Sequence, residues 1–150
     1  MDDKFFMEQA LAQARRAELA GEVPVGALLV RDGQIIADHN RTIGNHDPSG
    51  HAEIIVLRRA GQHFNNHRLT GAAVYCTLEP CLMCLGALLQ ARVEKLVFAA
   101  WDPRFGACGS QFDLARSKQL NFQIKQLQGG LMEEEARALL QNFFKARRKK

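Results

Sequence analysis

The first forty residues show one helical and two strand-like hydrophobic patterns. Residues 3–20 carry apolar side chains at helical spacing and predict an amphipathic helix. Two short apolar runs follow at 25–30 and 34–39, and each is typical of a strand. The dipeptide Asp32-Gly33 lies between them and is a strong signal for a two-residue turn. We therefore expect a β-hairpin after the first helix.

Helical and strand-like patterns continue to alternate through the rest of the chain. We expect a loop at 40–50, which is dense in Asn, Gly, Asp and Pro, and an irregular stretch at 101–111. Residues 112–118 fit neither pattern. The remaining predicted elements are a helix at 51–60, a strand at 72–77, a helix at 81–91, a strand at 94–100, a strand at 121–127 and a helix at 133–148.

This order of elements indicates an α/β fold, because strands that alternate with helices form a shared sheet covered on both faces. We expect a three-layer α/β/α sandwich around a mixed sheet of about five strands. The chain has 150 residues, which is enough for one hydrophobic core, so we expect one domain over 1–150 with a basic tail at 145–150. Apolar residues make up 47% and charged residues 24%, as is ordinary for a globular protein.

The N-terminal sequence and the length of the apolar runs favour a cytoplasmic location. MDDKFFMEQA is acidic, whereas a secretory signal begins with basic residues. No apolar run in the sequence approaches the ~18 residues of a membrane span, so we expect no membrane partner. Cytoplasmic thiols stay reduced, and a cysteine pair there is more typical of a metal or catalytic site than of a disulfide.

The positive charge is concentrated at one end of the chain. The net charge is +4, and five of the last six residues are Lys or Arg, while the rest of the chain is nearly neutral. A concentrated charge of this kind is expected where a protein contacts a polyanion. The alternative is a solvated tail that complements the negative end of the last helix.

The predicted helix at 81–91 is apolar on nearly all sides and needs cover on more than one of them. A second subunit is a plausible cover in a domain this small, and we predict a homodimer that uses this helix. Its apolar residues are Leu82, Met83, Leu85, Ala87, Leu88, Leu89 and Ala91.

The stretch LEPCLMC contains two cysteines, Cys81 and Cys84. This pair can be half of a metal site, a redox dithiol, or two buried thiols. His51 favours the first, because it opens a predicted helix after a loop just as Cys81 opens the next one. Three protein ligands that leave one position for water are typical of catalytic zinc. We expect Cys76 and Cys108 to be buried or loop thiols outside the site.

Glu53 follows His51 by two residues and precedes an apolar run. Residues two apart in a regular helix lie on different faces. If His51 occupies the first position of the helix, before its geometry becomes regular, Glu53 can reach a metal-bound water without binding the metal itself.

The motifs HAE (51–53) and PCLMC (80–84) resemble the zinc deaminase signature H-x-E…P-C-x-x-C. Further stretches are similar to the family of tRNA-specific adenosine deaminases: EVPVGALLV, NRTIGNHDPSGHAEI, DPRFGACGS and FFKARR. The resemblance covers nearly the whole chain and implies the cytidine deaminase type of α/β/α sandwich. It also implies one Zn²⁺ per subunit and no organic cofactor.

The resemblance assigns roles to individual residues. It implies that His51, Cys81 and Cys84 bind zinc and that Glu53 carries the proton. It implies substrate contacts by Asn40 with the flipped base, by Asp102 and Arg104 with anticodon nucleotides, and by Phe144, Arg147 and Arg148 of the last helix with RNA.

The implied reaction is hydrolytic deamination of the wobble adenosine of a tRNA, arginine tRNA in this family, to inosine. Zinc-activated hydroxide attacks C6 of adenine while Glu53 moves the proton. The implied partner is the tRNA anticodon stem-loop, whose unpaired bases can be extruded at small cost.

Three alternatives predict different behaviour. A deaminase of free bases or nucleosides, of guanine or cytosine type, shares the zinc residues but needs no cationic tail. An RNA-binding module with structural zinc requires a fourth protein ligand and tolerates replacement of Glu53. A redox dithiol leaves His51 and Glu53 without a role.

Overall fold

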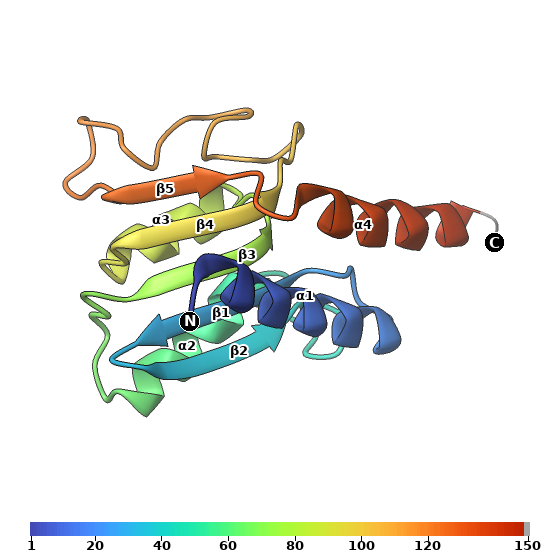
Figure 1. The fold of residues 1–150 in the computed structure, drawn as a ribbon, viewed down its shortest axis with the longest axis horizontal. Helices are drawn as coiled ribbons and strands as arrows, with labels where there is room; N and C mark the ends of the chain where they lie inside the picture. The colour runs from blue at the N-terminus through green and yellow to red at the C-terminus, as the bar shows by residue number, and fades with distance from the viewer. Residues whose placement is uncertain (149–150) are drawn as a thin grey trace.

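A computed structural model of the chain, which describes residues 1–148, forms one five-stranded sheet between two layers of helices (Figure 1). The nine elements follow the predicted order of helices and strands. They are α1 (Asp3–Leu19), β1 (Gly26–Arg31), β2 (Gln34–His39), α2 (Ala52–His63), β3 (Ala73–Leu78), α3 (Leu82–Gln90), β4 (Lys95–Ala100), β5 (Gln126–Gly129) and α4 (Glu133–Arg148).

The sheet is mixed, with strand order β2-β1-β3-β4-β5. β1 pairs antiparallel with both β2 and β3, whereas β3, β4 and β5 run parallel. The hairpin turn predicted at Asp32-Gly33 is confirmed. Both residues have positive φ, 52° and 74°, as a two-residue turn with the twist of a β-hairpin requires.

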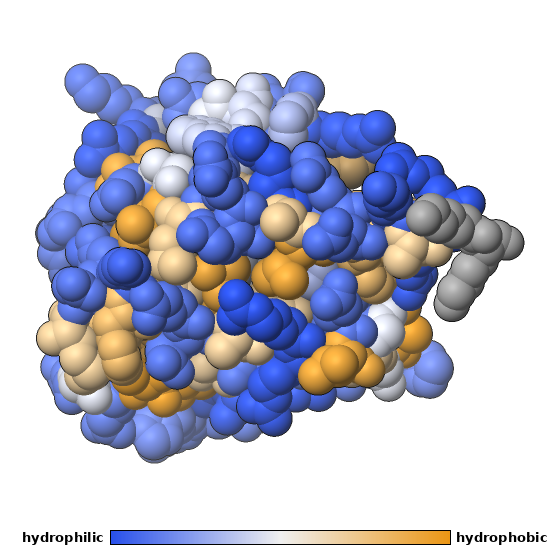
Figure 2. Space-filling view, turned by 45° about the vertical axis from the view of Figure 1, so that its right-hand side comes forward, coloured by the Kyte–Doolittle hydropathy of each residue, from blue (hydrophilic) through white to orange (hydrophobic). Residues whose placement is uncertain are grey.

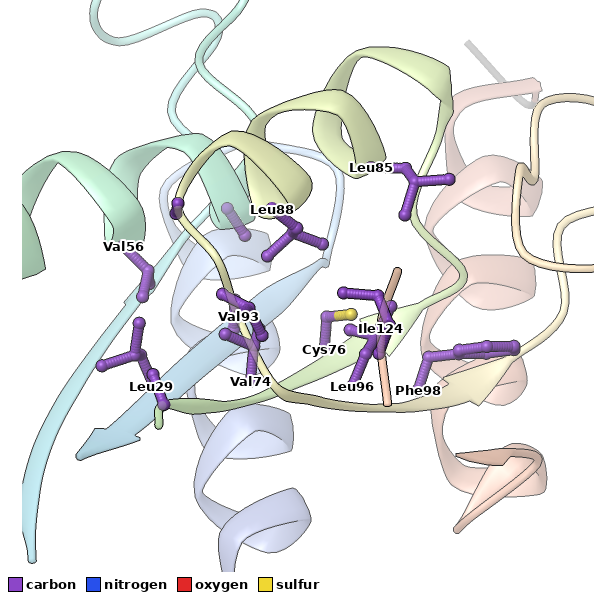
Figure 3. Close-up of a cluster of buried hydrophobic side chains, with 14 of the residues drawn as sticks. Leu29, Val56, Val74, Cys76, Leu85, Leu88, Val93, Leu96, Phe98 and Ile124 are labelled. Carbon is purple, nitrogen blue, oxygen red and sulfur yellow. The ribbon is translucent and has the colours of Figure 1, made fainter. Parts of the chain in front are cut away.

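Helices cover both faces of the sheet, which confirms the three-layer α/β/α sandwich. α1 and α4 pack on one face and contact each other, and α2 and α3 lie on the other. Residues of β3 alternate between the layers: Val74 and Cys76 face α2 and α3, while Tyr75 faces α1. Figure 3 shows the larger cluster, in which Leu85 and Leu88 of α3 lie over Val74, Cys76 and strand β4.

The predicted strand at 121–127 is wrong at its start, because β5 begins only at Gln126. Before that point the chain turns. The side-chain amide of Gln123 donates to the backbone oxygens of Ser117 and Leu120, at 3.0 and 2.6 Å. These bonds hold the preceding residues in turns, and pairing with β4 begins where Gln126 meets Lys95. The ambiguous segment at 112–118 forms neither a helix nor a strand.

The parallel strands β3 and β4 end at the same edge of the sheet, and α4 extends beyond that edge (Figure 1). Loops that follow parallel strands meet at their carboxyl ends, where α/β proteins place their ligands. Within residues 1–148 no helix combines the length and the hydrophobicity that crossing a bilayer would need.

Candidate active site

Two helices begin beside each other at the site, and each begins with a predicted metal ligand. His51 is the N-cap of α2 and Cys81 is the N-cap of α3. Both residues have extended backbone, with φ and ψ of −69° and 154° for His51 and −76° and 175° for Cys81, and neither side chain caps its own helix. The expectation that His51 precedes the regular helix is therefore confirmed, and the side chains point toward each other instead.

The side chains of His51, Cys81 and Cys84 form one compact donor set, with all three ligand atoms within 4.8 Å of one another. The His51 Nδ1 atom lies 3.7 Å from Cys81 Sγ and 3.4 Å from Cys84 Sγ. A tetrahedral zinc ion with ordinary bond lengths separates a nitrogen and a sulfur ligand by about 3.5 Å. The donor set therefore fits a zinc-sized ion in both chemistry and spacing.

The three groups shift one another's pKa values. The hydrogen bond from the Cys84 thiol, and then the neighbouring imidazole, lower the pKa of Cys81 to about 4. The bond to Cys81 raises the pKa of the His51 imidazole. The Cys84 thiol has a raised pKa, because it donates to Cys81 and is buried. The site thus holds one thiolate and one thiol proton, and binding of a metal ion would release that proton.

Glu53 is buried and lines a cavity of about 490 Å³, together with Cys81 and Asn40. Burial raises the pKa of the Glu53 carboxyl to about 7, against the smaller influence of its own backbone N–H. A carboxyl with a pKa near neutrality can both accept and donate a proton at working pH. Val25 and Leu78 form apolar parts of the wall.

The cavity opens into a longer groove of about 830 Å³ that reaches α4. Val23, Leu78, Asp102 and Phe105 line both hollows, so the two are continuous. The groove brings together most of the predicted RNA-contacting residues, namely Asp102, Arg104, Phe144, Arg147 and Arg148. On the side of the molecule that carries the end of α4, hydrophobic patches alternate with hydrophilic side chains (Figure 2).

Two of the predicted RNA-contacting residues also make internal contacts. Arg147 donates from Nη2 to the Gly21 oxygen at 2.9 Å, and its guanidinium lies 4.5 Å from the centre of the Phe143 ring. Asp102 accepts from two backbone N–H groups of its own turn through Oδ1. Lys149 and Lys150 of the predicted basic tail lie outside the described residues.

Two buried carboxylates that the sequence analysis did not single out hold the loops around the site. Glu22 accepts backbone N–H groups of Ile43 at 3.1 Å and Gly44 at 2.7 Å, in the loop between Asn40 and α2. Glu79 does the same for the loop after β4. A glutamate directly after an apolar strand was a usable signal at Glu79, because a charge at such a position needs partners.

The other two cysteines lie where they were expected. Cys76 is fully buried in the sheet beneath α3, and Cys108 is buried in the loop after β4. Burial is the main cause that raises the pKa of both thiols, so they stay protonated. Neither belongs to the donor set of His51, Cys81 and Cys84.

Comparison with known proteins agrees with this geometry. The chain matches the family model of MafB19-like deaminases over residues 1–148. The fold and the grouping of a histidine, two cysteines and a nearby glutamate thus define an enzyme of the deaminase class.

Relatives with high sequence identity indicate which family of deaminases the chain belongs to. The chain is 42% identical to the tRNA-specific adenosine deaminase of Bacillus subtilis over 99% of this chain and 92% of that protein. Its identity to the enzyme of the same name from Aquifex aeolicus is 41%, over 97% of this chain and 95% of that protein. The chain belongs to the family of tRNA-specific adenosine deaminases, which confirms the resemblance of its motifs.

Solved structures support the fold assignment. One, from studies of A-to-I editing by tRNA:A34 deaminases at the wobble position of transfer RNA, has a TM-score of 0.86 and 40% identity and covers 91% of this chain and 99% of that one. A guanine deaminase from Nitrosomonas europaea has a TM-score of 0.78 and 26% identity, with coverage of 95% and 84%.

Proposed function

We propose that this enzyme converts adenosine to inosine at the wobble position of a tRNA anticodon, with arginine tRNA as the expected substrate. The observation that carries the proposal is the continuity between the cavity of Glu53 and the groove along α4. The cavity has room for one base, and the groove offers cations and an exposed aromatic ring to the nucleotides around it. The names of the relatives point to the same reaction.

We also propose that His51, Cys81 and Cys84 hold one zinc ion in each subunit. Their spacing matches tetrahedral zinc, and three protein ligands leave one position for solvent. When bound, zinc supplies Lewis acidity that lowers the pKa of a water molecule toward neutrality. His51 and Cys81 lie at the N-termini of α2 and α3, where the partial positive charge of a helix would stabilise the Cys81 thiolate as a ligand.

Glu53 moves the proton in the proposed reaction. Its carboxylate takes a proton from the attacking water and delivers it to ring N1 of adenine, while the water oxygen bonds to C6. Glu53 then takes the remaining proton from the new C6 hydroxyl and gives it to the amino group, and the C6–N bond breaks as ammonia leaves. The remaining oxygen at C6 completes inosine. Asn40 would hydrogen-bond the base and fix its orientation, and its buried position in the wall of the same cavity supports this role.

Arg104, Phe144 and Arg148 form the proposed binding surface for the RNA. All three line the groove beside the cavity, and Phe144 is exposed, so a base can stack on its ring. Arginine is suited to phosphate because its guanidinium donates two parallel hydrogen bonds. Asp102 stands where the cavity meets the groove and would contact the nucleotides that flank the flipped base.

Deamination of a free base is the second candidate, and the similarity to a guanine deaminase favours it. The two candidates differ in what the groove along α4 is for. We expect the purified enzyme to convert adenosine to inosine in tRNA and in an isolated anticodon stem-loop, as read by sequencing, with far less turnover of free adenosine, guanine or cytosine. Deamination of a free base at a higher kcat/KM than the stem-loop would reject the tRNA proposal.

The remaining proposals concern the oligomeric state, the location and the domain organisation of the enzyme. We propose a homodimer built on the exposed side of α3, a cytoplasmic location, and one deaminase domain for the whole chain. The single sheet supports the last of these, because α1, α2 and α4 contact its strands and Leu85 and Leu88 of α3 share a core cluster with them.

A further inference from the structure

Glu79 is a charged residue inside the protein with only 2% of its surface exposed. It directly follows β3 and precedes Pro80 and Cys81, and it lines the cavity beside Glu53. Its position close to the donor set raises the question of whether it takes part in chemistry or holds other groups in place.

The hydrogen bonds of Glu79 answer this question. Oε1 accepts the backbone N–H of Asp102 at 2.9 Å and the hydroxyl of Ser110. Oε2 accepts the backbone N–H of Cys108 at 2.9 Å and of Ser110 at 3.1 Å. Each oxygen therefore has two donors, and the carboxylate is fully occupied as an acceptor. A carboxylate bonded in this way is a strong anchor for the segment that carries its donors.

The four bonds all end on one segment, the loop 102–110 after β4. The same loop packs tightly on Glu79, since a Cβ atom at Gly106 would lie 2.2 Å from the Glu79 carboxyl carbon. The loop also contacts the connection between β3 and α3 directly: Ala107 donates to the Pro80 oxygen at 2.9 Å, and Gly106 forms a β-bridge with Cys81. Glu79 thus joins the loop to the residues that present the cysteines.

We propose that Glu79 is a positioning residue for substrate recognition: its carboxylate fixes the loop 102–110 and thereby sets the wall formed by Asp102, Arg104 and Phe105. This inference rests on the proposed function, because that wall faces the nucleotides around the target base. Glu79 acts through the loop and does not touch the reacting atoms.

The substitution Glu79→Gln tests the proposal with little change in shape. In glutamine, an NH₂ group replaces one of the two carboxylate oxygens. Each of these oxygens accepts at least one backbone N–H, and an NH₂ group cannot accept, so at least one of these hydrogen bonds is lost. Hydrogen exchange of the free enzyme should become faster at Asp102, Cys108 and Ser110. On the anticodon stem-loop, KM should rise about tenfold or more while kcat changes less than about threefold, and the metal content should stay equal to that of the parent enzyme.

Two further variants separate this role from general destabilisation. Ser110→Ala removes only the hydroxyl bond and should give a smaller change of the same kind. Glu22→Gln is a matched control, because Glu22 is equally buried and holds the loop at 42–44. It should speed exchange at Ile43 and Gly44 and leave the loop 102–110 protected.

Unchanged exchange of the loop 102–110 in Glu79→Gln would overturn the proposal, as would a fall in kcat at constant KM. The exchange measurement uses no substrate. It therefore tests the anchoring even if the enzyme proves inactive on tRNA, which would reject the proposed function instead.

Discussion

At the scale of single residues, the chemistry depends on where two helices begin. His51 and Cys81 have extended backbone just before α2 and α3, so their side chains face each other and not along their own helices. Glu53, in the first turn of α2, is then carried into the same cavity without joining the donor set. His51 as a metal ligand and Glu53 as a proton carrier can therefore serve one site although they are only two residues apart in the sequence.

Replacing Glu53 by alanine separates metal binding from catalysis. We expect Glu53→Ala to retain the metal, because the carboxylate is outside the donor set. Loss of general acid–base catalysis should lower kcat by about 10²–10⁴-fold. The measurements are metal content by elemental analysis and turnover on an anticodon stem-loop. Turnover close to that of the parent enzyme would contradict the assigned role.

Replacing Cys81 by alanine tests the ligand set. Cys81→Ala removes one of three protein ligands and should leave the purified protein with little bound zinc and no activity. Cys108→Ala is the control, since Cys108 is a buried thiol outside the donor set and its loss should leave the zinc content unchanged. A full complement of zinc in Cys81→Ala would exclude Cys81 as a necessary ligand.

At the scale of elements, ion pairs of Asp38 hold strand β2 against helix α2. Asp38 near the end of β2 accepts from Arg41 at 2.8 Å and from Arg59 of α2 at 2.9 Å. Burial alone would raise the pKa of Asp38, but the bonds from the His39 N–H and the two arginines outweigh it, and the pKa lies below its usual value. The strand that leads to Asn40 is thus tied to α2 by a charged group.

The lowered pKa of Asp38 makes its contribution to stability depend on pH. A carboxyl with a lower pKa in the folded state stabilises the fold above its unfolded pKa, about 3.8, and loses this effect as the pH falls through the folded value. Asp38→Asn should therefore unfold more easily than the parent at pH 7. The difference in unfolding free energy, measured with denaturant, should shrink below about pH 4. A difference that stays constant down to pH 2 would contradict this.

The end of α4 should contribute to RNA affinity through charge. Arg148 lines the groove. On single-stranded nucleic acid, each phosphate that a protein cation neutralises adds about 0.7 to the steepness with which the logarithm of the binding constant falls with the logarithm of the salt concentration. Arg148→Gln should weaken stem-loop binding and reduce the slope by this amount. Arg15→Gln, on α1, is a control of equal charge, because Arg15 is exposed and does not line the groove. Equal slopes for Arg148→Gln and the parent would remove Arg148 from the binding surface.

At the scale of the whole molecule, residues 1–148 of a single chain leave one face of α3 without cover. Leu82 and Met83 of α3 are 52% and 40% exposed, although the opposite side of the same helix is in the core. A cavity of about 880 Å³ lies between α2 and α3, on the face of the sheet that these two helices cover, and Ala87 of α3 contributes to its wall. An apolar helix that is half covered is the surface on which we expect the second subunit to dock.

A charge on this face should separate the subunits. We expect the parent enzyme to be a dimer at micromolar concentration and Met83→Glu to be a monomer, as measured by light scattering, because burying the carboxylate is costly. Leu19→Glu is the control, since Leu19 is 89% exposed at the end of α1 and should not change the molar mass. A monomeric parent enzyme, or a dimeric Met83→Glu variant, would contradict the prediction.

Much of the architecture could be predicted because it depends on local patterns. The short apolar run of β3, the helical spacing in α1 and the Asp32-Gly33 turn are each set by a few neighbouring residues. Their order along the chain then limits the arrangement to a layered α/β fold. β5 was placed too early, because the turn held by Gln123 has no local hydrophobic signature.

The sequence by itself determined the elements and the chemical kind of site, since a histidine, two spaced cysteines and a glutamate carry their chemistry with them. Only the tertiary structure decided which groups meet. His51 and Cys81 are 30 residues apart along the chain, and their approach depends on packing of α2 and α3 against a common sheet. The anchoring of the two loops by Glu22 and Glu79 was equally hidden, because a hydrogen bond to a distant backbone N–H leaves no periodic trace in the sequence.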